Sequence, residues 1–263
     1  VKILIYTPTH PEYGIKAQTR ESIYRAMMSY DGPVDWHVSH NDNPQATGFE
    51  NVTHQHNKAR IMVLENDYDA LLSIEADMIV PEHTIQALID ADADVVYGLY
   101  VWRVKQELRD RMPPRWNAYS DLTLWGGCSV VVDRTAARQL WGKTIEASGL
   151  GMGCTLIHRH VLQALRFRLH DGKPGWIAKE YAPEIARLSA WGVDVDLSRP
   201  RPGMVCDDWL LAMDVAHEGY LQKAHLGVVC GHIDGDEALW PDPTEELMYR
   251  VEALNGLSEP VSV

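Results

Sequence analysis

The sequence predicts an α/β fold in which a mainly parallel central sheet is flanked by helices. Short apolar runs typical of buried strands alternate with segments of helical periodicity, and polar or Pro-containing turns separate them. Such alternation produces parallel strands, because each helix returns the chain to the edge at which the next strand begins. A chain of 263 residues that is 46% hydrophobic can bury one substantial core. We therefore expect a single domain over 1–263.

The first half of the chain contains the regular part of this pattern. Each expected strand is an apolar run, and each expected helix has apolar positions three or four residues apart. The expected strands are Val1 to Tyr6, Val34 to Ser39, Ala70 to Ile74 and Val95 to Val101, and the expected helices are Gln18 to Tyr30, Asn57 to Asn66 and one whose first turn holds Pro81 and Glu82. Open sheets of this kind bind ligands beyond the carboxyl ends of their strands. The residues that follow each strand are therefore the first candidates for a site.

The second half is less regular. Arg103 to Asp121 is polar and rich in Arg and Pro, which is typical of a loop, and Lys173 to Arg201 is expected to be irregular. Between them, Gly149 to Gly153 precedes an apolar strand and an expected helix from His158 to Phe167. The helix Cys206 to Glu218 has a clear apolar stripe and stops at Gly219, and the strand Ala224 to Cys230 follows it.

Composition excludes some classes of function. The formal net charge of -13 is spread over the whole chain and disfavours nucleic acid as a partner, because phosphate backbones attract basic surfaces. No apolar run approaches the ~20 residues that cross a bilayer, so we expect no transmembrane segment and a cytoplasmic protein.

The cysteines contain no C-x-x-C pair, which favours buried free thiols. His54, His56, His158 and His160 are expected on the surface.

Two acids and a histidine follow apolar strands. Glu75 and Asp77 flank Ala76 directly after a predicted strand, and an extended backbone would point both carboxylates the same way. Such a pair suits Mg²⁺ or Mn²⁺, which leave positions free for diphosphate oxygens. His232 follows the strand Ala224 to Cys230, and neutral imidazole is an ordinary ligand for such ions. Helix caps, solvated turns and a hydrogen-bonded structural histidine remain the alternatives.

Asp207 and Asp208 open the predicted helix after Cys206. Acids are favoured in the first turn by the exposed amides and by the positive end of the helix dipole, which explains one of them. Two adjacent carboxylates exceed what a cap requires. The second is therefore a candidate general base.

The order of these motifs resembles that of the GT-A fold glycosyltransferases, which have a Rossmann-like sheet, and in particular the large inverting group called family two. The resemblance covers nearly the whole chain. The matching segments are Ile3 to His10 (first strand and turn), His56 to Arg60 (Arg-Asn-x-Gly helix start), Leu71 to Asp77 (strand and D-x-D motif, with Glu for the first Asp), Gly151 to Arg159 (glycine-rich acceptor-side segment) and Asp207 to Tyr220 (Glu-Asp helix).

The resemblance implies transfer of a sugar from a nucleotide diphosphate donor, UDP- or GDP-linked, to an acceptor hydroxyl. It implies that Asp208 is the catalytic base, that inversion results, and that Asp77 and His232 hold Mn²⁺ or Mg²⁺. The implied donor-binding residues are Thr7, Pro8, Thr9, His10, Asn41, Asp42, Asn57, Arg60, Glu75, Ala76 and Asp77, and the implied acceptor-side residues are Gly151, Met152, Gly153, Asp207 and Trp209. Arg103, Arg199 or Arg201 would close over phosphate.

The resemblance also divides the chain. Residues 1–102 would form the nucleotide-sugar-binding half, 103–240 the acceptor-side half, and 241–263 a C-terminal helix and tail.

Three rival functions remain open. A nucleotidyltransferase that makes a nucleotide sugar uses a related sheet, but it usually carries a Gly-rich basic loop after the first strand, and Thr7 to Gly14 lacks one. A retaining transferase of the same fold could also place an acid near Asp208. A non-catalytic sugar-nucleotide or glycan-binding module would lose the base or a metal ligand, whereas Asp77, Asp208 and His232 are all present.

Overall fold

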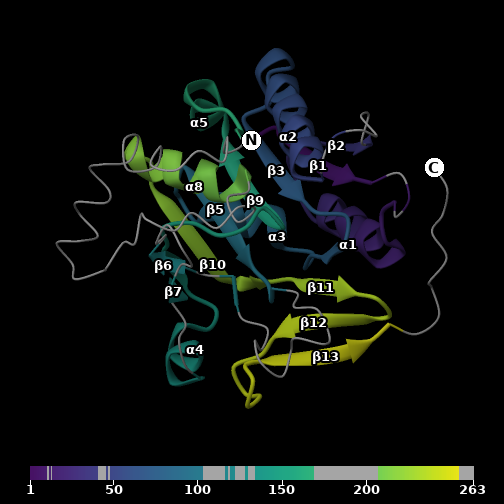
Figure 1. The fold of residues 1–263 in the computed structure, drawn as a ribbon, viewed down its shortest axis with the longest axis vertical. Helices are drawn as coiled ribbons and strands as arrows, with labels where there is room; N and C mark the ends of the chain where they lie inside the picture. Colours follow the sequence, from purple (N-terminus) through teal and green to yellow (C-terminus); the bar gives the residue numbers. More distant parts are fainter. Residues whose placement is uncertain are drawn as a thin grey trace.

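The computed structural model describes residues 1–10, 12, 14–40, 46, 48–102, 116–117, 119–121, 128–129, 134–168 and 207–254. In this part of the chain the predicted α/β architecture is confirmed (Figure 1). The central sheet has seven strands, in the order β2 (Val34–His40), β1 (Ile3–Thr9), β3 (Ala70–Ile74), β9 (Cys154–His158), β5 (Val95–Leu99), β10 (Gln222–Val229) and β8 (Thr144–Glu146). All run in one direction except β9 and β8, which are antiparallel to their neighbours.

Helices cover both faces of this sheet because its strands are apolar on both sides. Along β1, Ile3 and Ile5 belong to the core under α1 (Ala17–Met28) and α3 (Thr84–Asp90). The alternate residues Leu4 and Tyr6 belong to the core on the opposite face. The helices of that opposite face are α2 (Gly48–Glu65), α5 (Arg159–Ala164) and α8 (Asp207–His217). This period-2 division between two cores is what fully buried strands in an α/β sheet require.

A second, antiparallel sheet lies beyond the carboxyl ends of β3 and β5 (Figure 1). Its strand order is β13 (Tyr249–Ala253), β12 (Glu237–Pro241), β11 (Gly231–Asp234) and β4 (Met78–Ile79). This sheet was not expected from the sequence. Its pairing of β4 with β11 brings the segment after β3 against the segment after β10.

The C-terminal helix expected within 241–263 is not found in the described part, 241–254. The strand β13 occupies that segment and pairs with β12. Its residues, Tyr-Arg-Val-Glu-Ala, alternate between apolar and charged side chains, so the period is that of a strand rather than of a helix.

Among the other boundaries that differ from the prediction are those of β1 and α2. β1 continues to Thr9, and Pro8 is tolerated there because pairing with β3 has already ended at Tyr6. α2 begins at Gly48 rather than at Asn57. Its first turns bury polar side chains, among them Asn51 and Gln55, so an apolar stripe does not mark them.

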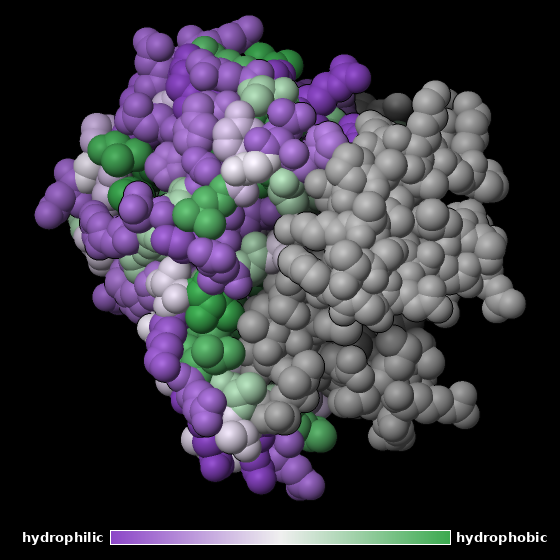
Figure 2. All heavy atoms as spheres, turned by 90° about the vertical axis from the view of Figure 1, so that its left-hand side faces the viewer, coloured by the Kyte–Doolittle hydropathy of each residue, from purple (hydrophilic) through white to green (hydrophobic). Residues whose placement is uncertain are grey.

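The remaining elements of the described ranges are two strands that pair with each other and one short helix. They are β6 (Tyr119–Asp121), β7 (Cys128–Ser129) and α4 (Arg134–Leu140). α8 ends where Gly219 takes a φ of +78°, which confirms the predicted stop. The face of the molecule seen in Figure 2 is mainly hydrophilic in its described part, with apolar residues in small separate groups. No helix of the described ranges combines the length and the apolar character that crossing a membrane requires.

Candidate active site

The acids after β3 and the histidine of β11 meet at the junction of the two sheets. Glu75 and Asp77 do not lie on extended backbone as predicted, because the amide of Met78 donates to the carbonyl of Glu75 (3.1 Å) and closes a turn. Next to this turn, His232 pairs with Met78 in the β4–β11 ladder. The amide of Ile233 also donates to the carbonyl of Asp77 (2.8 Å). Strand pairing, rather than alternation along one strand, therefore brings the three side chains together.

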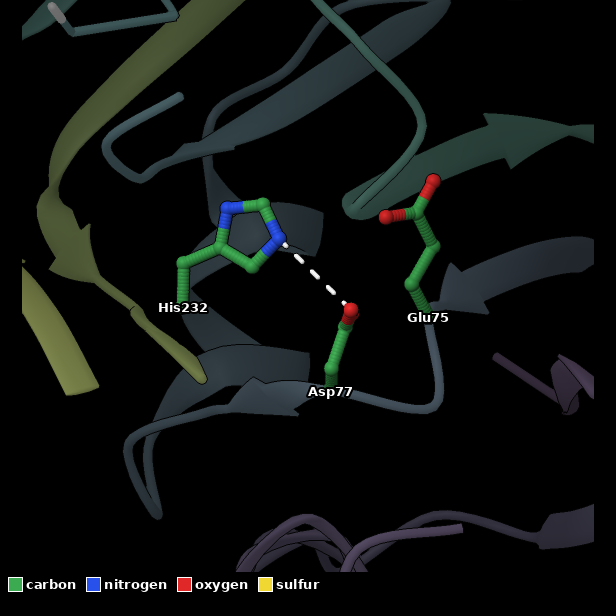
Figure 3. Close-up of side chains that lie close together, drawn as sticks. All are labelled: Glu75, Asp77 and His232. Atoms are coloured by element: carbon green, nitrogen blue, oxygen red, sulfur yellow. Dashed lines mark ion pairs between the residues drawn. The ribbon is translucent and has the colours of Figure 1, made fainter. Parts of the chain in front are cut away.

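The three side chains form a compact set of potential ligands. Glu75, Asp77 and His232 each offer one ligand atom, and these atoms lie within 4.8 Å of one another (Figure 3). The Nε2 atom of His232 is 3.7 Å from Oδ2 of Asp77. His232 is buried, whereas the two acids are partly buried and so remain within reach of a ligand. Two carboxylates and an imidazole are suitable ligands for a Mn²⁺-like ion.

The orientation of His232 identifies the atom that would bind. Its Nδ1 atom lies 2.8 Å from the carbonyl oxygen of Val101, which can only accept, so Nδ1 carries the proton. The lone pair is then on Nε2, and Nε2 is buried without a hydrogen-bond partner in the described part of the chain. Metal-binding histidines are typically held in this way through their other nitrogen. The residues present thus fit a divalent cation.

Negative charge is concentrated in this cluster. Burial and the neighbouring Asp77 raise the pKa of Glu75 to about 7, and Asp208 also raises it, whereas His232 and His56 oppose the shift. Without a cation, the cluster therefore resists full ionisation near neutral pH. A bound cation would offset the repulsion between the carboxylates and would let Glu75 ionise.

Asp208 reaches the cluster from α8. A Cβ atom placed on Gly151 would lie 3.3 Å from its Oδ2 atom. Its charge also contributes, after burial, to the raised pKa of Tyr97. The candidate base, the candidate ligands and Gly151 therefore lie in one neighbourhood, although they are far apart in the sequence.

The antiparallel direction of β9 brings the glycine-rich segment to the same edge. Because β9 runs against β3, its first residue Cys154 pairs with the last residue of β3, Ile74. Gly151 and Gly153 therefore stand beside the Glu75–Asp77 turn, and the amide of Glu75 donates to the carbonyl of Gly153 (3.1 Å). Met152, between the glycines, is buried in the core.

The predicted donor-binding residues of β1 are engaged in packing. The Thr9 hydroxyl donates to the carbonyl of Ser39 (2.8 Å), and the Thr7 hydroxyl accepts from Nε1 of Trp36 (3.0 Å). Pro8 is buried, whereas His10 is exposed. The carbonyl of Ala76 accepts from the amide of Lys16 (3.0 Å). A donor-binding role for these residues stays a prediction.

Asn57 and Arg60 contact the region of α5, and a donor-binding role for them stays a prediction. Asn57 lies inside α2 rather than at its start, and its side chain donates to the carbonyl of Phe167 (2.7 Å). Arg60 Nε donates to the carbonyls of Leu162 and Leu165 (2.6 and 2.7 Å). Both contacts attach α2 to the region of α5.

Several predicted site residues lie where the structure gives no placement. The residues outside the described part are Asn41, Asp42, Arg103, Arg199 and Arg201. Asp207 and Trp209 begin α8, but their side chains also lie outside the described part. The roles expected of these residues therefore stay predictions.

Two residues near the site were missed or misplaced. His56 was expected on the surface, but it is buried, with Nε2 3.5 Å from the Ser73 hydroxyl. Tyr100 was assigned to the strand that in fact ends at Leu99, so it is the residue that follows β5. With that boundary placed correctly, the search for residues after strands would have found it.

Comparison with known proteins bears on the fold. Neither the family models nor the curated proteins that we compared with the chain match it. Among solved structures, the chain is similar to A197 from STIV, with 17% identity, a TM-score of 0.54, and coverage of 100% of this chain and 99% of that chain. The fold is therefore a known one. At this identity the likeness extends to the fold alone.

Two further structures are more weakly similar. One is a glycosyltransferase involved in the glycosylation of the major capsid of PBCV-1, with 12% identity, a TM-score of 0.36, and coverage of 62% of this chain and 63% of that chain. The other is S. aureus TarS 1–349, with 10% identity, a TM-score of 0.34, and coverage of 64% of this chain and 50% of that chain. Similarity at this level does not assign an activity.

Proposed function

We propose that the chain is a metal-dependent glycosyltransferase that moves a sugar from a nucleotide diphosphate donor to an acceptor hydroxyl. The observation that supports this most directly is the convergence of Glu75, Asp77 and His232 with Asp208 at one edge of the sheet. Such a set suits a reaction in which a diphosphate departs while a hydroxyl loses its proton.

Asp77 and His232 would hold the cation, either Mn²⁺ or Mg²⁺. The carboxylate of Glu75 lies close enough to both side chains to bind the same ion. When bound, the ion would supply positive charge that neutralises the departing diphosphate. The protein contributes the rigid placement of these ligands. His232 is oriented by the carbonyl of Val101, and Asp77 lies in the turn that pairs with β11.

Asp208 would act as the general base. It comes from a different element than the proposed ligands, and it lies beside Gly151 on the proposed acceptor side. A carboxylate there would take the proton from the acceptor hydroxyl as that oxygen attacks the anomeric carbon. Direct displacement of the diphosphate would invert the anomeric centre. The configuration of the product, read by NMR, separates this mechanism from that of a retaining transferase.

A donor panel tests the proposal. UDP-, GDP-, dTDP- and CDP-linked sugars are each added with Mn²⁺ or with EDTA, and the melting temperature is measured. We expect one donor class to raise the melting temperature, and only with Mn²⁺, because the proposed site binds the diphosphate through the ion. A ligand at 100 times its Kd stabilises the fold by about 2.7 kcal/mol. Absence of any donor-dependent shift would contradict the proposal. Release of pyrophosphate from a nucleoside triphosphate and a sugar phosphate would instead identify a nucleotidyltransferase.

A further inference from the structure

We infer that Gln222 is a positioning residue whose side chain sets the spacing between the proposed base, Asp208, and the segment that carries Gly151. The sequence gives no sign of this role, because Gln222 begins β10 just before the apolar run that predicts the strand. The consequence for turnover rests on the proposed function of Asp208. The link between the helix and the segment does not, and it can be measured without any substrate.

The side chain of Gln222 is buried between three parts of the molecule. Only 4% of the residue is exposed. Its Oε1 atom accepts from the hydroxyl of Tyr97 on β5 (2.6 Å). Its Nε2 atom donates to the carbonyls of Ala212 on α8 (3.0 Å) and of Ser148 (3.3 Å). Those two carbonyls can only accept, so they fix the orientation of the amide. One side chain thus joins the sheet, the helix and the segment before Gly151.

The helix that Gln222 contacts presents Asp208 on its core-facing stripe. Leu211 and Val215, three and seven residues after Asp208, are buried in the same core as Tyr97. This spacing places all three side chains on one face of α8. The charge of Asp208 agrees with that placement, because it contributes, after burial, to the raised pKa of Tyr97. A shift of α8 against the sheet would therefore move the proposed base.

Gln222 also holds the start of the segment that leads to Gly151. Its carbonyl accepts from the amide of Ala147 (3.0 Å), and its side chain donates to the carbonyl of the next residue, Ser148. The far end of the segment is held by Thr155, whose hydroxyl donates to the carbonyl of Gly151 (3.2 Å). The segment is therefore fixed at both ends, and Gln222 connects the first of these ends to α8.

A polar link defines the position of a helix better than apolar packing alone. Apolar burial has no direction, so a helix can shift along a sheet with a small change in buried area. A buried hydrogen bond has a narrow range of favourable distances and angles, and an unpaired buried amide costs free energy. Gln222 therefore favours one arrangement of Asp208 relative to Gly151. Misplacement of a reacting group by about 1 Å can lower a rate about 100-fold.

Hydrogen exchange tests the link without substrate or metal. In EDTA, Gln222→Leu removes the three side-chain hydrogen bonds and keeps an apolar side chain of similar size. We expect amide exchange to become roughly 2- to 10-fold faster both in the first turns of α8 and in 148–151, as when one ordinary hydrogen bond is lost. Helix α1, on the opposite face of the sheet, should be unchanged. Faster exchange in only one of the two segments, or throughout the chain, would overturn the inference.

A double-mutant cycle tests the connection to the sheet. Tyr97→Phe and Gln222→Leu are made singly and together, and urea unfolding is measured in EDTA. We expect the double variant to lose less stability than the two single losses predict. Tyr68→Phe is the matched control, because it removes a tyrosine bond to Asp35 in another part of the molecule (2.8 Å), and its loss should add to that of Gln222→Leu. Additive losses for Tyr97→Phe would overturn the connection.

Turnover separates positioning from stability. Gln222→Leu should lower kcat roughly 10- to 100-fold with Mn²⁺ affinity and the donor KM near wild type, because Asp77 and His232 lie on other elements. Val215→Ala is the matched control on the same helix, since it removes only apolar contacts of a fully buried side chain. It should lower the melting temperature while kcat stays near wild type. A kcat that follows the melting temperature in both variants would overturn the positioning role.

A wild-type chain that transfers no sugar from any donor would reject the proposed function, whereas faster exchange of both segments in Gln222→Leu would still support the link. Transfer by the wild type, combined with unchanged exchange in Gln222→Leu, would overturn the inference and leave the proposed function standing.

Discussion

At the scale of single residues, the proposed metal site depends on one hydrogen bond to a residue outside it. The bond from Nδ1 of His232 to the carbonyl of Val101 leaves Nε2 as the lone-pair atom, directed toward Asp77 (Figure 3). Asp77 would contribute both a ligand atom and a charge, whereas His232 would contribute a ligand atom alone. The two residues should therefore differ in their effect on metal affinity.

We predict that Asp77→Asn weakens Mn²⁺ binding more than His232→Ala does. An amide offers the ion no compensating charge, while water or a diphosphate oxygen can occupy the place of one imidazole. Calorimetric titration of Mn²⁺ into EDTA-treated protein measures both variants. Equal affinity in wild type and Asp77→Asn would remove Asp77 from the site, and an unchanged titration of His232→Ala would make that residue structural.

For Asp208, we predict that substitution by Asn abolishes transfer while donor and metal binding stay near wild type. The carboxylate would act only on the acceptor, so its loss should appear in kcat. Asp207→Asn should have a smaller effect. A capping role for Asp208 would produce the opposite pattern, with most activity kept and about 0.5–2 kcal/mol of stability lost. Activity and unfolding are therefore measured on the same samples.

Glu75 provides a prediction about pH. Its pKa in the metal-free fold, about 7, lies above its ordinary value of 4.5, so protonated Glu75 favours the fold at low pH. That stability is fully present below about pH 4.5 and is lost as the pH rises through about 7. Glu75→Gln lacks this dependence. In EDTA, its melting temperature relative to wild type should therefore rise between pH 5 and pH 8, and a constant difference would contradict the assignment.

At the scale of elements, side chains from the α5 region hold the end of α2. Arg159 donates to the carbonyls of Val63, Leu64 and Tyr68 at 2.6, 2.7 and 3.0 Å. The last carbonyls of a helix have no hydrogen-bond partner within it, and they form the negative end of its dipole. A cationic donor therefore stabilises this end of the helix. The guanidinium of Arg159 thus links the end of α2 to the start of α5, which directly follows β9.

We predict that Arg159→Met lowers the free energy of unfolding by about 1.5–3 kcal/mol, the range for hydrogen bonds to charged groups. Arg250→Met is the matched control, since Arg250 pairs with Glu252 on an exposed strand and should contribute less than about 1 kcal/mol. Urea unfolding of both variants decides the matter. Equal losses would mean that the hydrogen bonds of Arg159 to the helix end contribute no more stability than an exposed ion pair does.

At the scale of the whole molecule, the proposed cation would connect the two sheets. Asp77 lies in the turn between β3 and β4, and His232 lies on β11. We predict that Mn²⁺ slows amide hydrogen exchange in β4 and β11, including the Ile233 amide that donates to Asp77, more than in β2 at the far edge of the central sheet. Uniform slowing, or none, would contradict a cation at this junction.

Local sequence patterns determined the parallel strands of the central sheet, the main helices and the acids that follow β3. The run Ala70 to Ile74 is apolar at nearly every position and is bounded by polar residues, so its limits were predicted correctly. Helix α8 was predicted because its apolar stripe and Gly219 are both local signals. The candidate ligands were found in the same way, since position after a strand can be read without knowledge of the neighbours.

Only the tertiary structure decided how these parts meet. The two residues of β4 carry no pattern of their own and become a strand because β11, far along the chain, pairs with them. The same pairing, together with the turn after β3, makes Glu75, Asp77 and His232 converge. Tyr100 was missed because the predicted strand continued to Val101, and its packing against Gly151 and Gly153 depends on the antiparallel strand β9. Non-local pairing leaves no periodic signal in the sequence, which is why these contacts could not be predicted from it.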